Sequence, residues 1–123
     1  MGLYGIDMNT LCCMPPYEII PKGSKLVVYG AGAVGKLFVQ AFRMGEYADI
    51  IMWVDENYMS FDKKLQVKPP VNLLQEEYDY VLLASATKEV AENMKTNLLR
   101  LGVEEEKILW KKVQIKSCWG YKI

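Results

Sequence analysis

The chain has 123 residues, of which 51% are hydrophobic and 24% charged, a composition that fits one folded domain and excludes a disordered protein. Its 15 basic and 15 acidic residues balance, so the sequence lacks the excess of positive charge that nucleic-acid binding needs. The chain contains no histidine, which excludes Ser-His and Cys-His catalytic pairs for this chain acting alone.

Membrane insertion and metal binding are also disfavoured by the sequence. No apolar run approaches the roughly 20 residues that cross a bilayer, and the first residues do not follow the pattern of a signal peptide. The three cysteines are an odd number, and the neighbouring pair Cys12-Cys13 has no histidine with which to bind zinc. We therefore expect a cytoplasmic protein without a metal site.

Residues 1–24 show no regular hydrophobic period and are interrupted by Pro15-Pro16 and Pro21. This lead-in segment is nevertheless too apolar for a free tail. We expect it to pack on the domain or on a second subunit. Its apolar residues include Leu3, Tyr4, Ile6, Met8, Leu11 and Met14.

The rest of the chain alternates between apolar runs and helical patterns. Strands separated by helices are joined by right-handed crossovers, which predicts one small Rossmann-like three-layer α/β domain over residues 25–110. Its sheet should be mostly parallel, with strand order 3-2-1-4-5. Residues 111–123 are expected to form an edge strand or a tail. The predicted strands are 25–29, 50–54, 65–68, 80–84 and 108–110, and the predicted helices are 33–44, closed by Gly45, and 88–101, closed by Gly102.

The first predicted strand runs directly into Gly30-x-Gly32-x-x-Gly35. In dinucleotide-binding units the first glycine allows a tight turn, the second lets a pyrophosphate approach the backbone, and the third lets the helix pack on the sheet. Asp55 ends the second strand, 20 residues beyond Gly35, where a carboxylate accepts ribose hydroxyls and repels a 2′-phosphate. The pattern therefore predicts NAD rather than NADP.

Small residues follow the strand at 80–84, where the strand order reverses and ligands of open α/β sheets bind. Two alternatives stay open. Ser85 or Thr87 could cap the following helix, and the glycines could persist for turn geometry after loss of a ligand. The predicted cofactor-binding residues are Gly30, Ala31, Gly32, Ala33, Val34, Gly35, Asp55, Ala84 and Ser85.

Four stretches carry a resemblance to a known group of domains. They read Ile-Pro-Lys-Gly-Ser-Lys-Leu-Val-Val-Tyr-Gly-Ala-Gly-Ala-Val-Gly at 20–35, Trp-Val-Asp-Glu-Asn-Tyr at 53–58, Tyr-Asp-Tyr-Val-Leu-Leu-Ala at 78–84 and Leu-Gly-Val-Glu-Glu-Glu-Lys-Ile at 101–108. Together, over about residues 16–110, they resemble the NAD(P)-binding-like Rossmann domains of bacterial surface-polysaccharide and nucleotide-sugar biosynthesis proteins. Such domains accompany glycosyltransferases, FkbM-type methyltransferases and sugar acyltransferases, and begin epimerases and dehydratases. The resemblance implies that the glycine loop and Asp55 contact a nucleotide.

The chain departs from the catalytic members of these groups in two ways. Ala33 and Val34 stand where sugar acyltransferases of this type have glycine and histidine, and no tyrosine is followed by lysine four residues later. We therefore expect a module that binds NAD or a nucleotide-sugar and is not catalytic alone, with a second copy or a sugar-modifying enzyme as partner. The alternatives are the cofactor-domain fragment of an NAD-dependent epimerase or dehydratase, and a ligand-free relic that acts in dimerisation.

Overall fold

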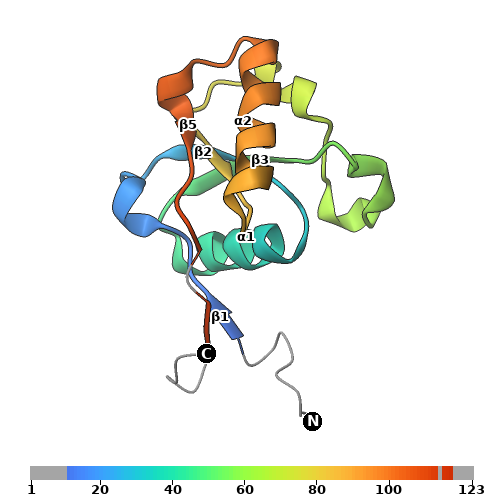
Figure 1. Ribbon diagram of the computed structural model, residues 1–123. Coiled ribbons are helices and arrows are strands. Elements are labelled where there is room, and N and C mark those ends of the chain that lie inside the picture. Colours follow the sequence, from blue (N-terminus) through green and yellow to red (C-terminus); the bar gives the residue numbers. More distant parts are fainter. Residues whose placement is uncertain (1–10, 114, 118–123) are drawn as a thin grey trace.

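In the computed structural model, which describes residues 11–113 and 115–117, a four-stranded parallel sheet lies between helical layers (Figure 1). The predicted α/β class is therefore confirmed. The sheet strands and the helices between them are β2 (Lys25–Tyr29), α1 (Ala33–Gly45), β3 (Asp49–Val54), β4 (Tyr80–Leu83), α2 (Lys88–Leu101) and β5 (Ile108–Leu109). Short 3-10 turns occur at η2 (Tyr17–Ile19), η3 (Tyr58–Ser60), η4 (Lys63–Leu65), η5 (Pro70–Gln75) and η6 (Glu105–Lys107).

The strand order is β3-β2-β4-β5, so the predicted five-stranded order is wrong. The segment at 65–68, which was expected to be a strand beside β3, forms only one parallel bridge, from Lys68 to Val54. Gln66 has a φ of 58°, in the left-handed region, and Pro69 follows Lys68 without an N–H group to donate. The segment therefore cannot hold an extended ladder.

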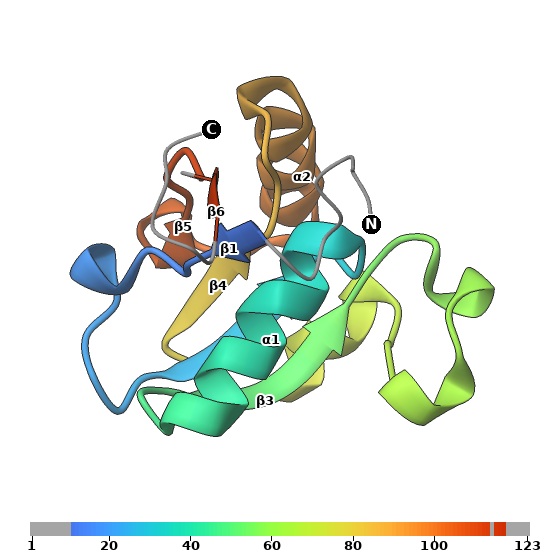
Figure 2. The same ribbon diagram turned by 90° about the horizontal axis from the view of Figure 1, so that it is seen from below.

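The sheet is covered on both faces, which explains why its strands are apolar throughout. On β2, Leu26 and Val28 point into the core under α1, whereas Val27 and Tyr29 point into the core under α2. All four side chains are at most 2% exposed. Figure 2 shows α1 across one face of the sheet and α2 on the other. This burial on two sides is typical of parallel sheets.

Part of the lead-in segment packs on the domain, on the face that carries α1. Ile20 is 2% exposed, and Tyr17 contacts the rings of Phe42 and Tyr47 edge-on. The Tyr47 hydroxyl donates to the Ile20 carbonyl oxygen at 2.6 Å. Tyr17, Ile19 and Ile20 thus pack against the core on the α1 side of the sheet. The apolar residues Leu3, Tyr4, Ile6 and Met8 lie outside the described residues.

The described residues near the two ends of the chain pair with each other. β1 (Leu11–Cys13) and β6 (Ile115–Ser117) form a separate antiparallel ribbon, in which Cys12 lies opposite Lys116. The described part of the tail therefore does not extend the main sheet. β1 also contacts α1, so the ribbon lies against the domain (Figure 2).

The predicted bounds of α2 are correct, whereas the predicted end of α1 is not. Thr87 caps α2 through its hydroxyl, which accepts from the Val90 N–H, and Gly102 closes the helix with a φ of 95°. Gly45, by contrast, is the last residue of α1, and Glu46 takes the left-handed position with a φ of 54°. The predicted end of α1 is therefore wrong by one residue.

Candidate functional site

Residues 30–32, which we call the glycine turn, join β2 to α1. The turn contacts the ends of the two neighbouring strands, β3 and β4. Gly30 has a φ of 120°, which a residue with a side chain rarely adopts, and its N–H donates to the Val54 carbonyl oxygen at 2.8 Å. A Cβ atom at this position would lie 2.8 Å from the carbonyl oxygen of Ala84. Residue 30 must therefore be glycine for the turn to close against β4.

Gly35 is required for packing alone. A Cβ atom here would collide with the carbonyl oxygen of Gly30, because the first turn of α1 lies directly on the glycine turn. The same oxygen accepts a buried hydrogen bond of 2.7 Å from the indole Nε1 of Trp53. These contacts would be needed with or without a ligand.

Gly32 is in a different situation. It is exposed and is the N-cap of α1, and among the described residues no atom outside Gly32 and its two chain neighbours lies within 4 Å of its Cβ position. No side chain of the part of the chain that the structure describes caps the helix here, and its first turn contains no acidic residue. The N–H groups at the start of a helix have no intrahelical partners and lie at the positive end of its dipole. This end of α1 could therefore receive an anion.

Asp55 links the end of β3 to the glycine turn. Its Oδ2 accepts from the Ala31 N–H at 2.8 Å, and its Oδ1 accepts from the Asn57 N–H at 2.7 Å. Ala31 is fully buried, so the carboxylate satisfies an N–H group that water cannot reach. The half-buried carboxylate keeps lone pairs for further donors, because each of its oxygens can accept two hydrogen bonds.

Ala84 and Ser85 lie next to the glycine turn but are 7% and 6% exposed. The Ser85 hydroxyl donates to the Thr87 carbonyl oxygen at 2.9 Å and accepts from the Thr87 N–H at 3.1 Å. The Trp110 indole Nε1 donates to the Ser85 carbonyl oxygen at 3.0 Å. Ser85 thus orders the turn before α2, while Thr87, the other residue of the capping alternative, is the one that caps the helix.

The predicted site residues therefore divide by accessibility. Gly32 and Ala33 are exposed, and Val34 and Asp55 are half-buried. The others shape the turn from within and are buried: Gly30, Ala31, Gly35, Ala84 and Ser85.

One polar cluster next to Asp55 was not predicted. The Asn97 amide donates to Glu56 Oε1 at 2.9 Å and to the Tyr29 hydroxyl at 3.5 Å. Burial raises the pKa of Tyr29, the Asn97 hydrogen bond lowers it, and the nearby Glu56 and Asp55 carboxylates raise it further. Glu56 follows Asp55 directly and was visible in the sequence, whereas nothing in the sequence relates Asn97 to either residue. The cluster ties α2 to the loop that carries Asp55.

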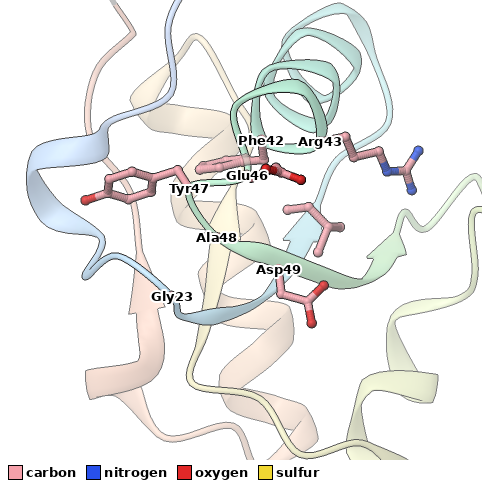
Figure 3. Close-up of a pocket in the computed structure, with 8 residues that line it drawn as sticks. Gly23, Phe42, Arg43, Glu46, Tyr47, Ala48 and Asp49 are labelled. Atoms are coloured by element: carbon pink, nitrogen blue, oxygen red, sulfur yellow. The ribbon is translucent and has the colours of Figure 1, made fainter.

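A cavity of about 460 Å³ opens at the opposite edge of the sheet, where β3 begins (Figure 3). Figure 3 shows the charged side chains of Arg43 and Asp49 pointing in different directions rather than toward one point. Parallel sheets of this type bind ligands at the carboxyl ends of their strands, so the glycine turn is the better candidate site. The cavity is lined by Gly23, Phe42, Arg43, Glu46, Tyr47, Ala48, Asp49 and Ile50.

Residues 11–113 and 115–117 contain neither a grouped set of metal ligands nor a membrane-spanning helix. In this part of the chain no three His, Cys, Asp or Glu side chains are grouped so that they could hold a metal ion. Nor does this part contain a helix with the length and apolar character needed to cross a membrane.

Comparison with known proteins gives one match. Residues 22–109, more than half of the chain, match a family model described as C2185-like, N-terminal. That description names no ligand or reaction. No curated protein and no solved structure matches the chain.

We predict losses of different size for alanine at the last and at the middle glycine of the motif. Gly35→Ala should lower the free energy of unfolding by about 3 kcal/mol, because its Cβ collides with backbone that cannot move aside. Gly32→Ala should cost less than about 1 kcal/mol, because its Cβ enters open space. Urea unfolding of both variants measures the difference. Equal losses would contradict the described packing of α1 on the turn.

Removing the Asp55 carboxylate should destabilise the protein in the absence of any ligand. Asp55→Ala leaves the buried Ala31 N–H without a partner, at a cost of about 2 kcal/mol in urea unfolding. Asp55→Asn keeps one acceptor and should lose less than Asp55→Ala. Asp62→Ala is the control, since Asp62 accepts from an exposed N–H, that of Lys64, which water can satisfy. A loss at Asp55 no larger than at Asp62 would contradict a structural role for the carboxylate.

The raised pKa of Tyr29 predicts a loss of stability in alkali. The unfolded chain releases the phenol proton near the ordinary pKa of 10, while the folded chain retains it to higher pH. The stabilisation is therefore fully present below about pH 10 and is lost as the pH rises toward the raised pKa. Between about pH 9 and 11 the free energy of unfolding should fall more steeply for the wild type than for Tyr29→Phe. Parallel curves would contradict this contribution.

Proposed function

The chain belongs to the C2185-like N-terminal family, and we propose that it binds NAD or a nucleotide-sugar at the carboxyl edge of its sheet. The observation that carries the proposal is the exposed, uncapped start of α1 at Gly32, with the Asp55 carboxylate beside the same turn. We further propose that it serves sugar or surface-polysaccharide biosynthesis in the cytoplasm and is not catalytic alone.

The diphosphate of such a ligand would lie at Gly32. Within residues 11–113 and 115–117, no atom beyond the chain neighbours of Gly32 lies within 4 Å of its Cβ position, which leaves room for a phosphate to approach the backbone closely. The helix N-terminus supplies N–H donors, and the first turn of α1 holds no carboxylate that would compete for them. The side chain of any larger residue at position 32 would occupy this space.

The ribose would lie at Asp55. The carboxylate already accepts from Ala31 and Asn57, and it retains acceptor capacity for the two hydroxyls of an adenosine ribose. A 2′-phosphate would be repelled by this charge and by the neighbouring Glu56 carboxylate. We therefore propose a preference for NAD over NADP.

The two described hydroxyl groups closest to the glycine turn are not available for catalysis, which supports binding without chemistry by this chain alone. The Ser85 hydroxyl is engaged with the Thr87 backbone, and Tyr29 is 2% exposed. A partner enzyme or a further domain would then supply the reacting groups, as in an NAD-dependent epimerase or dehydratase of which this chain is the cofactor domain.

One observation favours a second candidate, a ligand-free relic. Gly30, Gly35, Asp55 and Ser85 each make contacts within the protein that explain their presence without any ligand. Only Gly32 lacks such a structural reason among the three glycines of the motif. The two candidates therefore differ most clearly at Gly32.

Ligand-induced stabilisation of the folded state tests the proposal. NAD or a UDP-sugar at about ten times its dissociation constant should stabilise the wild type by roughly 1.4 kcal/mol, a shift of several degrees in Tm. NADP should shift Tm less. Gly32→Val should fold and show no shift, whereas Gln40→Val, an exposed position in the middle of the same helix, should respond like the wild type. A wild type that responds to none of these ligands at millimolar concentration would favour the relic.

A further inference from the structure

A groove of about 410 Å³ runs along α2, on the side that faces β5. Leu83, Ala91 and Ile108 line it, together with the half-buried Trp110. Figure 1 shows α2 as the outermost layer on its face of the sheet, with β5 alongside. Within the described residues β5 pairs only with β4, so the groove lies at an open edge of the sheet.

Six residues of α2 line this groove. Besides Ala91 and Thr96, four of them form one stripe, which consists of Lys88, Glu92, Lys95 and Leu99. Their spacing of four, three and four residues places them on one helix face. The stripe carries charges in the order positive, negative, positive, and then ends in an apolar side chain. Leu99 is 44% exposed, although it is large and apolar.

The charges of the stripe are complementary to those of a second copy of the same stripe that runs antiparallel to it. If two α2 helices lie antiparallel about a two-fold axis midway between positions 92 and 95, Glu92 of each copy faces Lys95 of the other. In the same register Leu99 of each copy faces Lys88 of the other, at the end of the groove that Trp110 lines. We propose that two copies of this chain associate through α2 in this antiparallel register.

The surroundings of the stripe fit this arrangement. Lys95 pairs with Glu105 at 2.7 Å within one chain, so it would lie between two carboxylates across the interface. The Trp110 indole is fixed by its hydrogen bond to the Ser85 carbonyl oxygen, so it presents a preordered apolar surface to Leu99 of the second copy. A two-fold interface needs one patch that fits itself. Here the stripe supplies attractive charges at the centre, and Leu99 of each copy next to Trp110 of the other supplies an apolar contact at both ends.

Such an interface is small. A single helix stripe buries less than the roughly 1,200 Å² at the lower end of stable interfaces, so association should be weak and dependent on concentration. We expect a monomer in dilute solution and a rise in the weight-average sedimentation coefficient toward that of a dimer by about 0.5 mM protein.

Charge exchange at positions 92 and 95 tests the register. Glu92→Lys places lysine opposite lysine, and Lys95→Glu places glutamate opposite glutamate, so each variant alone should remain monomeric at concentrations where the wild type associates. An equimolar mixture of the two single variants should associate again, because each chain then meets opposite charge. The double variant Glu92→Lys/Lys95→Glu should also associate.

Glu77→Lys makes the same change of charge at an exposed position outside the groove and should associate like the wild type. All samples are compared by sedimentation without nucleotide, so the result is independent of the proposed ligand, and circular dichroism verifies that each variant is folded. A wild type that stays monomeric at about 0.5 mM would overturn the proposal. Single variants that associate like the wild type, or a mixture that does not recover, would overturn it equally.

Discussion

The close contact between the first turn of α1 and the glycine turn is the constraint on which the rest of the structure depends. Because Gly35 has no side chain, α1 can lie on the carbonyl oxygen of Gly30, which the Trp53 indole holds from β3. This contact fixes where α1 starts, and therefore where its free N–H groups point. It also brings the end of β3 within reach of the turn, so that Asp55 can accept from the Ala31 N–H.

The strands and helices of this unit could be predicted because each has a strong local signal. The apolar run at Lys25–Tyr29 reflects burial on both faces, and the ends of α2 are marked by Thr87 and Gly102. The expected strand at 65–68 does not form because Gln66 adopts the left-handed conformation and Pro69 follows the segment. The apolar pattern alone does not predict that conformation. α1 ends one residue later than predicted because Glu46 adopts the left-handed conformation that glycine usually takes.

The candidate site was predictable as a set of residues but not as a set of contacts. The motif indicated which positions gather at the glycine turn, and the structure brings Gly30, Asp55 and Ala84 together there. It could not indicate that the Ser85 hydroxyl bonds to the Thr87 backbone or that Asp55 bonds to two N–H groups. Such contacts depend on loop geometry, which the residue pattern does not specify. Asp55 therefore has a structural role, and any ligand that bonds to its carboxylate would share that carboxylate with these two N–H groups.

We propose that a nucleotide binds where α1 begins, and an NMR titration of backbone amides tests this most directly. Adding NAD or a UDP-sugar should shift the amide signals of Gly32, Ala33 and Asn57, because the first two lie at the start of α1 and the third is bonded to Asp55. The signals of Glu46 and Asp49, which line the cavity at the opposite edge of the sheet, should not move. Unchanged signals at Gly32 and Ala33 at saturating ligand, or shifts confined to Glu46 and Asp49, would contradict the account.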